Sequence, residues 1–223
     1  TADNNISEII VRADGSSSIG TGHIIRCLTL ADELNKHGAA VSFICREETG
    51  NLIELVERKG YMVYRLPANI DLESDRKLTQ EILGSQSTPP DWLIVDHYDI
   101  DSSWEISFRK FVKKIMIIDD LADRTHDCDL LLDQNYNEST NRYQRLVPST
   151  CIQLLGPKYA LLRPQFSKAR EKLRNRTGEV KHILVFMGGA DPNNQTCKVL
   201  HAISMLNRPD ISTDVVIGAS NPN

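Results

Sequence analysis

The sequence predicts an α/β fold built around a doubly wound parallel sheet, and three observations support this. Apolar segments of strand length alternate with amphipathic segments of helix length along most of the chain. The first apolar segment, residues 8–13, is β-branched at its centre, which is typical of a strand covered on both faces. A strand, a glycine-rich loop and a helix follow one another near the beginning of the chain and again near its end. Such alternation favours parallel strands joined by helical crossovers.

The expected elements follow one another with mostly short connections. The first strand leads through the loop DGSSSIGTG into a helix that opens with His23 and carries its apolar residues on one face. Glycines at positions 60 and 84 end two of the later helices. Further strands are expected at 40–45, 62–66, 92–96, 114–119, 130–133 and 152–155, and helices at 51–59, 71–83 and 102–112.

The chain is expected to hold two domains of unequal extent. Residues 1–165 are assigned to an N-terminal Rossmann-like domain and residues 166–180 to a polar connector. Residues 181–223 repeat the N-terminal plan with a strand at 182–186, the loop MGGADPNNQ, a helix at 196–206 and a strand at 215–217. Because one βαβ unit cannot bury both faces of a sheet, we expect the chain to stop inside its second domain.

Composition narrows the range of partners. With 223 residues, 40% of them hydrophobic and 25% charged, and a formal net charge of −4, the chain is typical of a globular protein. No run of Lys and Arg exceeds two residues, so we expect no nucleic-acid partner. The absence of a long apolar run predicts no membrane span, and with no leader at the start we expect a cytoplasmic location. The five cysteines lack a C-x-x-C pair and are expected to be buried free thiols.

Polar residues gather where the predicted strands end. One group runs from Asp14 to His23 after the first strand, a second is Asp96-His97-Tyr98 after the fourth, and a third is Asp119-Asp120 after the fifth. Ligands of doubly wound sheets bind beyond the carboxyl ends of the strands, so we expect these groups to converge. Adjacent residues of a strand point to opposite faces, so at most one of the two aspartates in the third group faces a ligand. Their roles as an acid/base pair or as loop caps both stay open.

His23 is the candidate base of this site. It falls in the first turn of its helix, where the positive end of the helix dipole favours a neutral, proton-accepting imidazole. Gly20 and Gly22 keep the preceding loop small enough for a ligand to approach the backbone. Plain turn chemistry also accounts for such a loop. Arg26, one turn along the helix, either contacts the ligand or tethers the loop through a carboxylate such as Asp14.

Several long motifs carry a resemblance to a known family. The segments RADGSSSIGTGHIIRCLTLA, VDHYDID, IDDLADR, LLDQN, GPKYALLRPQF and FMGGADPNN occur in order between about residue 9 and residue 223. Together they resemble the UDP-2,4-diacetamido-2,4,6-trideoxy-β-L-altropyranose hydrolases of pseudaminic acid biosynthesis, and related spore-coat polysaccharide proteins share them. The resemblance implies two Rossmann-like domains of the GT-B type, similar to the MurG-like glycosyltransferases, with a UDP-sugar held between them. It also implies loss of UDP to water without a metal or another cofactor.

The resemblance also implies site residues. The histidine of the family's G-x-G-H motif falls on His23, which is therefore expected to be the general base. The residues expected to contact the sugar are Asp14, Ser18, Gly20, Gly22, Arg26, His97, Tyr98 and Asn135. Those expected at the nucleotide are Gly188, Gly189, Ala190, Asp191 and Asn194, because the N–H groups at the start of a helix suit a diphosphate.

Structural explanations stay open beside several of these assignments. His97 could be a strand-end histidine bound by its neighbours, and turn formation accounts equally for Asn135 and its neighbour Gln134. In the second glycine loop, Asp191 or Asn194 could simply cap the following helix.

We expect no metal site, because the histidines are dispersed and the one D-x-D sequence, Asp127-Cys128-Asp129, leads straight into a strand and is interpreted as a capped turn. The alternative functions are a glycosyltransferase of the same fold and a non-catalytic nucleotide-sugar-binding module. The sequence gives no indication of the oligomeric state.

Overall fold

The computed structural model describes residues 6–139, 141–173, 178–189, 191–218 and 221. Internal contacts divide the chain into two compact units. The first takes in the residues up to 163 except for 17–20, and the second takes in 17–20 and the residues from 164 onward. Among the described helices, none combines the length and the apolar character that a bilayer crossing needs.

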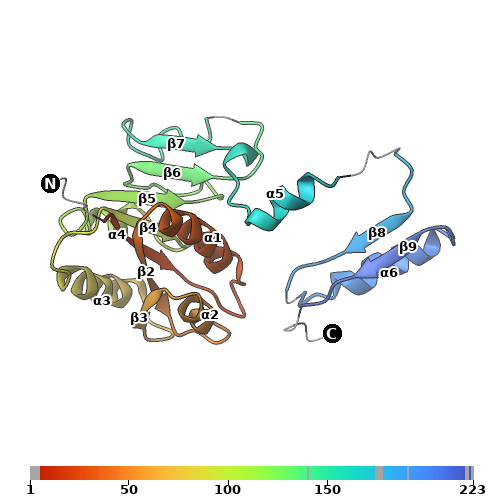
Figure 1. Cartoon of the computed structure of the whole chain (residues 1–223), viewed down its shortest axis with the longest axis horizontal. Helices are drawn as coiled ribbons and strands as arrows, with labels where there is room; N and C mark the ends of the chain where they lie inside the picture. The colour runs from red at the N-terminus through yellow and green to blue at the C-terminus, as the bar shows by residue number, and fades with distance from the viewer. Residues whose placement is uncertain (1–5, 140, 174–177, 190, 219–220, 222–223) are drawn as a thin grey trace. The chain divides into compact units, whose positions relative to one another are not determined.

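The first unit is built on a seven-stranded sheet in which every neighbouring pair is parallel. The strand order β3-β2-β1-β4-β5-β6-β7 is that of a Rossmann-like fold, and it confirms the predicted α/β class (Figure 1). The strands are β1 Glu8–Ala13, β2 Ala40–Arg46, β3 Met62–Leu66, β4 Trp92–Asp96, β5 Lys114–Ile118, β6 Leu130–Asp133 and β7 Ile152–Leu155.

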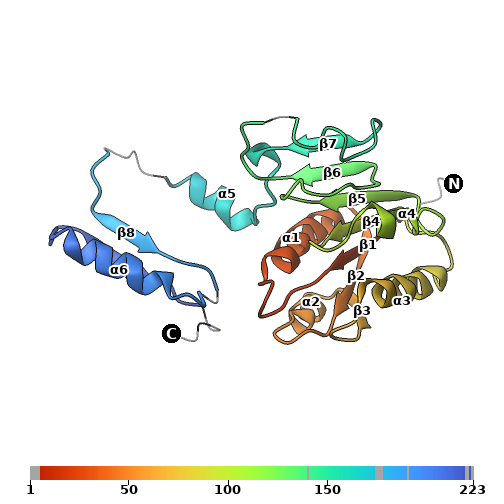
Figure 2. The ribbon, with the colours of Figure 1, turned by 180° about the vertical axis from the view of Figure 1, so that it is seen from behind.

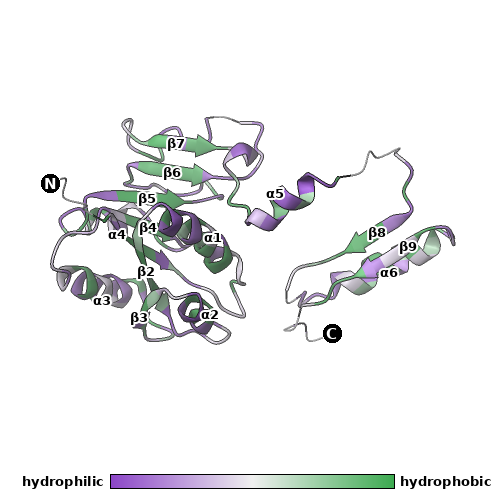
Figure 3. Ribbon diagram, viewed as in Figure 1, coloured by the Kyte–Doolittle hydropathy of each residue, from purple (hydrophilic) through white to green (hydrophobic). Residues whose placement is uncertain are grey.

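Helices cover both faces of this sheet, as Figures 1 and 2 show from opposite sides. Helices α1 Gly22–Lys36 and α2 Ile53–Arg58 pack on one face, and α3 Leu72–Gly84 and α4 Ser102–Ile106 pack on the other. Each face has its own apolar core, because alternate residues of a strand point to opposite sides. In β1, for example, Val11 belongs to the core under α1 while Ile10 belongs to the core under α3. The strands β5 and β6 are mainly hydrophobic in Figure 3, as expected of strands covered on both faces, whereas the edge strand β7 is partly exposed.

The topology fixes where a ligand site can form. Strands β1 and β4 are neighbours, and from this pair the chain builds the sheet outward in both directions. Ligands of open α/β sheets bind in the crevice at such a switch point, beyond the carboxyl ends of the strands. The loops that follow β1 and β4 are therefore the first place to look for function.

The second unit holds one βαβ unit of its own. Strands β8 His182–Val185 and β9 Ser212–Val215 form a two-stranded parallel sheet, and α6 Gln195–Met205 connects them. Helix α5 Pro164–Arg170 precedes them, and a short 3₁₀ helix, η1 Pro157–Tyr159, ends the first unit.

Two of the expected elements differ from the structure by more than two residues at one end. The helix expected at 102–112 ends at Ile106, and residues 107–111 continue as turns with i→i−3 backbone hydrogen bonds. The Ser107 hydroxyl donates to the carbonyl of Trp104 at 2.6 Å, and such local bonds compete with the helical pattern. The last strand was expected at 215–217 and lies at Ser212–Val215, because its pairing begins at Ser212 opposite His182.

Candidate active site at the ends of β1, β4 and β5

The three polar groups expected to converge do so in the structure. The loops after β1, β4 and β5 meet at the carboxyl edge of the sheet, around its switch point. Three contacts join them: His23 Nδ1 to Asp96 Oδ1 at 2.5 Å, His97 Nε2 to Asp14 Oδ2 at 3.2 Å, and Arg26 Nη1 to Asp120 Oδ2 at 3.1 Å. This convergence is the arrangement that the sequence predicted.

His23 is held by a carboxylate and an aromatic ring. Helix α1 begins at Gly22, so His23 lies in its first turn, as predicted, and only 6% of the residue is exposed. An ionised carboxylate can only accept hydrogen bonds, so its bond with Asp96 assigns a proton to Nδ1, and in the neutral ring the lone pair then lies on Nε2. Tyr98 packs edge-on against the imidazole, with ring centroids 4.5 Å apart and an interplanar angle of 81°. The ring therefore presents a basic nitrogen in a fixed orientation.

Asp96 is the partner of His23, and the sequence did not predict this pairing. It ends β4 and is fully buried. Arg26 binds it in a bidentate manner, with Nε to Oδ2 and Nη2 to Oδ1 both at 2.6 Å. Burial by itself would raise the pKa of Asp96, but hydrogen bonds from Arg26 and His23 outweigh it and hold that pKa below its ordinary value. Asp96 is thus an anion beneath the imidazole.

Arg26 tethers carboxylates, which was one of its two expected roles. Its partners are Asp96 and Asp120, and not Asp14 as suggested from the sequence. The guanidinium is largely buried, with 13% of the side chain exposed. Negative and positive charges therefore alternate from Asp96, beside the imidazole of His23, through Arg26 to Asp120.

Asp14 lies in a buried ion cluster next to the site. Arg12 binds it with both terminal nitrogens at 2.7 Å and also reaches Asp75 of α3 at 2.6 Å. Arg46 contributes its backbone N–H to Asp14 at 2.7 Å and its Nε to Asp75 at 2.9 Å. Burial opposes ionisation of Asp14, but the charge of Arg12 and a hydrogen bond from His97 hold its pKa far below the usual range. These bonds join β1, β2 and α3 at the switch point.

His97 and Tyr98 differ in what they offer a ligand. The backbone N–H of Asp99 donates to His97 Nδ1 at 3.0 Å, so the ring proton lies on Nε2, which donates to Asp14. Both ring nitrogens of His97 thus have partners in the protein. Tyr98 is 38% exposed beside His23. Burial and the charge of Asp120 raise the pKa of Tyr98, so its hydroxyl stays protonated.

The two aspartates after β5, Asp119 and Asp120, have different roles. Asp119 is buried and accepts hydrogen bonds from the backbone N–H of Ala122 and the hydroxyl of Tyr143, both at 2.9 Å. It therefore acts as the loop cap. Asp120 pairs with Arg26 instead.

The loop between β1 and α1 has the openness expected of it. Gly20 has φ of +80°, a conformation that favours glycine, and a methyl group built on Gly20 or Gly22 would meet nothing within 4 Å. Ser18 is exposed. Beyond β6, Asn135 is exposed as well, and its backbone N–H donates to the Asp133 carboxylate at 3.0 Å in a turn. Gln134 accepts from the N–H of Leu161 at 3.0 Å.

The second glycine loop caps its helix with two side chains. Asp191 accepts from the N–H groups of Gln195 and Thr196 at 2.8 and 2.9 Å, and Asn194 accepts from that of Cys197 at 3.1 Å. A diphosphate seeking these N–H groups would have to displace the Asp191 carboxylate. Gly188 has φ of +87° and lies ahead of this cap. Of the other residues expected at the nucleotide, Gly189 is described and Ala190 lies outside the described residues.

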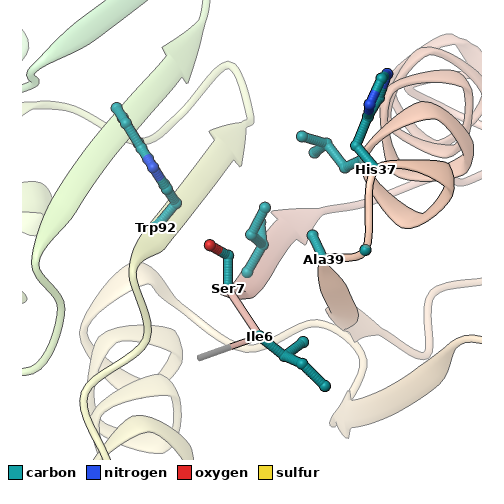
Figure 4. A pocket seen from close by; sticks show the side chains of 8 residues that line it. Ile6, Ser7, His37, Ala39 and Trp92 are labelled. Carbon is teal, nitrogen blue, oxygen red and sulfur yellow. The ribbon is translucent and has the colours of Figure 1, made fainter. Parts of the chain in front are cut away.

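Other features of the first unit are structural. A cavity of about 670 Å³ lies at the amino ends of β1 and β4, the opposite edge of the sheet, and none of the predicted site residues lines it (Figure 4). Asp127 and Asp129 bind Arg109 at 2.6 and 2.5 Å, in agreement with a structural role for the D-x-D sequence. Four of the five cysteines are buried free thiols, as expected, but the expectation was wrong for Cys197 of α6 in the second unit, which is exposed. Within the described residues, no group of three His, Cys, Asp or Glu side chains has the arrangement of a metal site.

Comparison with known proteins places the chain in a family. No protein-family model matches the sequence. Over 221 residues it is 31% identical to the UDP-2,4-diacetamido-2,4,6-trideoxy-β-L-altropyranose hydrolase of Campylobacter jejuni, a match that covers 97% of this chain and 71% of that enzyme. The chain belongs to this UDP-sugar hydrolase family. An uncharacterized protein of Methanocaldococcus jannaschii is 29% identical over 230 residues, which cover 95% of this chain and 42% of that protein. The chain thus spans less than half the length of the archaeal relative.

Membership of the hydrolase family agrees with the resemblance in the motifs and suggests an enzyme. At the ends of β1 and β4, the geometry places the imidazole of His23 against the buried carboxylate of Asp96.

Proposed function

We propose that this protein hydrolyses a UDP-linked diacetamido-trideoxy sugar to the free sugar and UDP, without a metal, with His23 as the general base. The observation that carries the proposal is the bond between His23 Nδ1 and the buried Asp96 carboxylate. It fixes the tautomer in which Nε2 can accept a proton. A base held in this way by a second group is the arrangement that proton abstraction from water requires.

In the proposed reaction, His23 Nε2 removes a proton from a water molecule as its oxygen bonds to the anomeric carbon. The bond between that carbon and the diphosphate oxygen breaks, and UDP leaves with the electron pair. The imidazolium that forms is stabilised by Asp96, which Arg26 holds in place from the other side. A positioned general base contributes about 10²- to 10⁴-fold to the rate.

The remaining site residues divide into two groups in this proposal. Tyr98, Ser18, Gly20, Gly22 and Asn135 are assigned to the sugar, because they are wholly or partly exposed. Asp14, His97 and Arg26 are assigned to positioning, since each is largely buried and bound to protein partners. The nucleotide is assigned to the loop of Gly188, Gly189, Ala190, Asp191 and Asn194.

Release of UDP from a panel of UDP-diacetamido sugars tests the function. The full-length protein should release UDP from at least one sugar when water is the only acceptor. A requirement for an added sugar acceptor would indicate a glycosyltransferase instead. Tight binding of every sugar tested, with no turnover, would indicate a binding module.

A further inference from the structure

The loop after β5 carries a carboxylate to which neither the fold nor the proposed reaction yet gives a role. Asp120 Oδ2 lies 3.1 Å from Arg26 Nη1, and the Asp120 side chain is 15% exposed. The two other guanidinium nitrogens of Arg26 donate to Asp96, so each of its three nitrogens binds a carboxylate. Without Asp120, one end of the guanidinium would lose its anion.

The backbone of Asp120 is itself anchored. Arg142 donates to the carbonyl oxygens of Asp120 and Leu121 at 3.1 and 2.9 Å, and its other terminal nitrogen binds Asp133 at the end of β6 at 2.6 Å. Three hydrogen bonds from one guanidinium, one of them an ion pair with Asp133, thus fix the turn that presents the Asp120 carboxylate. Arginine suits this role because its donors form a rigid fork. A carboxylate fixed in this way can orient the groups that bind it.

We propose that Asp120 is a positioning residue of the hydrolysis: by holding Arg26 against Asp96, it keeps His23 in the orientation and the charge environment that activation of water requires. This inference rests on the proposed function for its kinetic consequence. The groups around His23 that carry or can carry charge are Arg26 and Cys27 on its own helix, Asp96 at the end of β4, Tyr98 in the next loop and Asp120 after β5.

The sign of the electrostatic effect follows from this arrangement. Replacing Asp120 with Asn removes a negative charge and leaves the positive charge of Arg26 uncompensated on that side. Positive charge near an imidazole disfavours its protonated form, so His23 should take up its proton at lower pH.

The test uses three variants of the full-length protein. Asp120→Asn is nearly isosteric and should lower kcat about 10- to 100-fold, with a much smaller change in KM, because the base is misplaced and not removed. Asp120→Glu restores the charge and should recover part of kcat. Asp123→Asn is the control, since Asp123 lies in the same loop and pairs with Arg124, but is 59% exposed and outside this chain of contacts.

Titration of the His23 ring, followed by NMR without substrate, separates this inference from the proposed function. The midpoint should move down in Asp120→Asn, return toward the wild-type value in Asp120→Glu and stay unchanged in Asp123→Asn. If the midpoint shifts in Asp120→Asn but the protein hydrolyses no UDP-sugar, the coupling between Asp120 and His23 stands and the proposed function is rejected. Wild-type kcat and an unmoved midpoint in a folded Asp120→Asn variant would overturn the inference.

Discussion

His23 and Asp96 lie 73 positions apart in the sequence, and their side chains meet at 2.5 Å across the switch point of the sheet. The first turn of α1 supplies one and the end of β4 supplies the other. Because β1 and β4 are hydrogen-bonded neighbours, the fold itself sets this distance. The position of the site thus depends on the strand order as well as on the loop after β1.

Replacing His23 with Ala in the full-length protein should lower turnover by at least about 10²-fold, because the acceptor for the proton of water is lost. UDP affinity should change little, since the imidazole is assigned to water and not to the nucleotide. Steady-state kinetics and calorimetric titration with UDP measure the two quantities. Near-normal turnover would remove His23 from the role of base.

Asp96→Asn should lower kcat by about 10² or more, because the amide can hold His23 in the wrong tautomer and does not stabilise the imidazolium. The chain offers a matched control in the buried pair of Glu105 and His126, whose Oε1 and Nδ1 atoms are 2.6 Å apart outside the site. Glu105→Gln should reduce stability while the folded enzyme keeps its kcat. Equal kinetic losses in both variants would point to a general effect on folding.

The ion cluster around Arg12 should dominate local stability. Arg12→Met leaves Asp14 and Asp75 buried without their main cation, and we expect a loss of about 3–5 kcal/mol in the free energy of unfolding. Arg65→Met is the control, because Arg65 is 45% exposed where it pairs with Glu57, and its loss should change the free energy of unfolding far less. Urea denaturation measures both. Similar losses of stability in the two variants would contradict the dominant role of the Arg12 cluster.

The same cluster predicts a pH dependence. The pKa values of Asp14 and Asp75 are lowered in the folded protein, so these groups contribute stability above their unfolded pKa and lose it as the pH falls toward the folded value. Stability should therefore decline below about pH 4. Denaturation curves collected at a series of pH values, with Asp75→Asn for comparison, would show a weaker decline in the variant. If stability declined equally steeply with pH in Asp75→Asn, the ion cluster would not be the source of the pH dependence.

Chelators should leave activity intact. The carboxylates of the site are each bound to an arginine: Asp14 to Arg12, and Asp96 and Asp120 to Arg26. A cation would have to compete with these guanidinium groups. Activity lost in EDTA and restored by magnesium or manganese would contradict the proposal.

The site of bond cleavage gives a further check. If His23 directs water to the anomeric carbon, hydrolysis in ¹⁸O-water should place the label on the sugar. A single displacement should also release the sugar with inverted configuration. Mass spectrometry locates the label, and NMR of the first product reports the anomer. Label in UDP would mean attack at phosphorus, and the assignment of His23 would then fail.

Much of the fold was predictable because hydrophobic patterning is a local signal. Strands β3, β4, β6 and β7 have the bounds expected from the sequence. The prediction of a helix at 102–112 was wrong at its end. The apolar residues of this segment have helical spacing throughout, but the helix ends at Ile106. Periodicity reports which face is buried, and it does not report how the backbone hydrogen bonds are closed.

The site was predictable to the level of strand ends. The convergence of the groups at His23, Asp96 and Asp120 follows from parallel strands, whose carboxyl ends share one edge. The partner of Arg26 did not follow, because the choice among several carboxylates depends on side-chain geometry across strands. The proposed nucleotide residues near Gly188 remain a prediction.

Helix α1 places its functional and its structural residues in the same two turns. His23 and Arg26 face the carboxylates, while Ile24, Cys27 and Leu28 are nearly fully buried in the core. Any rotation or shift of the helix that moved the base would also unpack that core. Under the proposed function, divergence in sugar preference should therefore be carried by exposed loop residues such as Ser18, whose replacement leaves the core intact. On this proposal, the base and the sugar contacts are under different packing constraints.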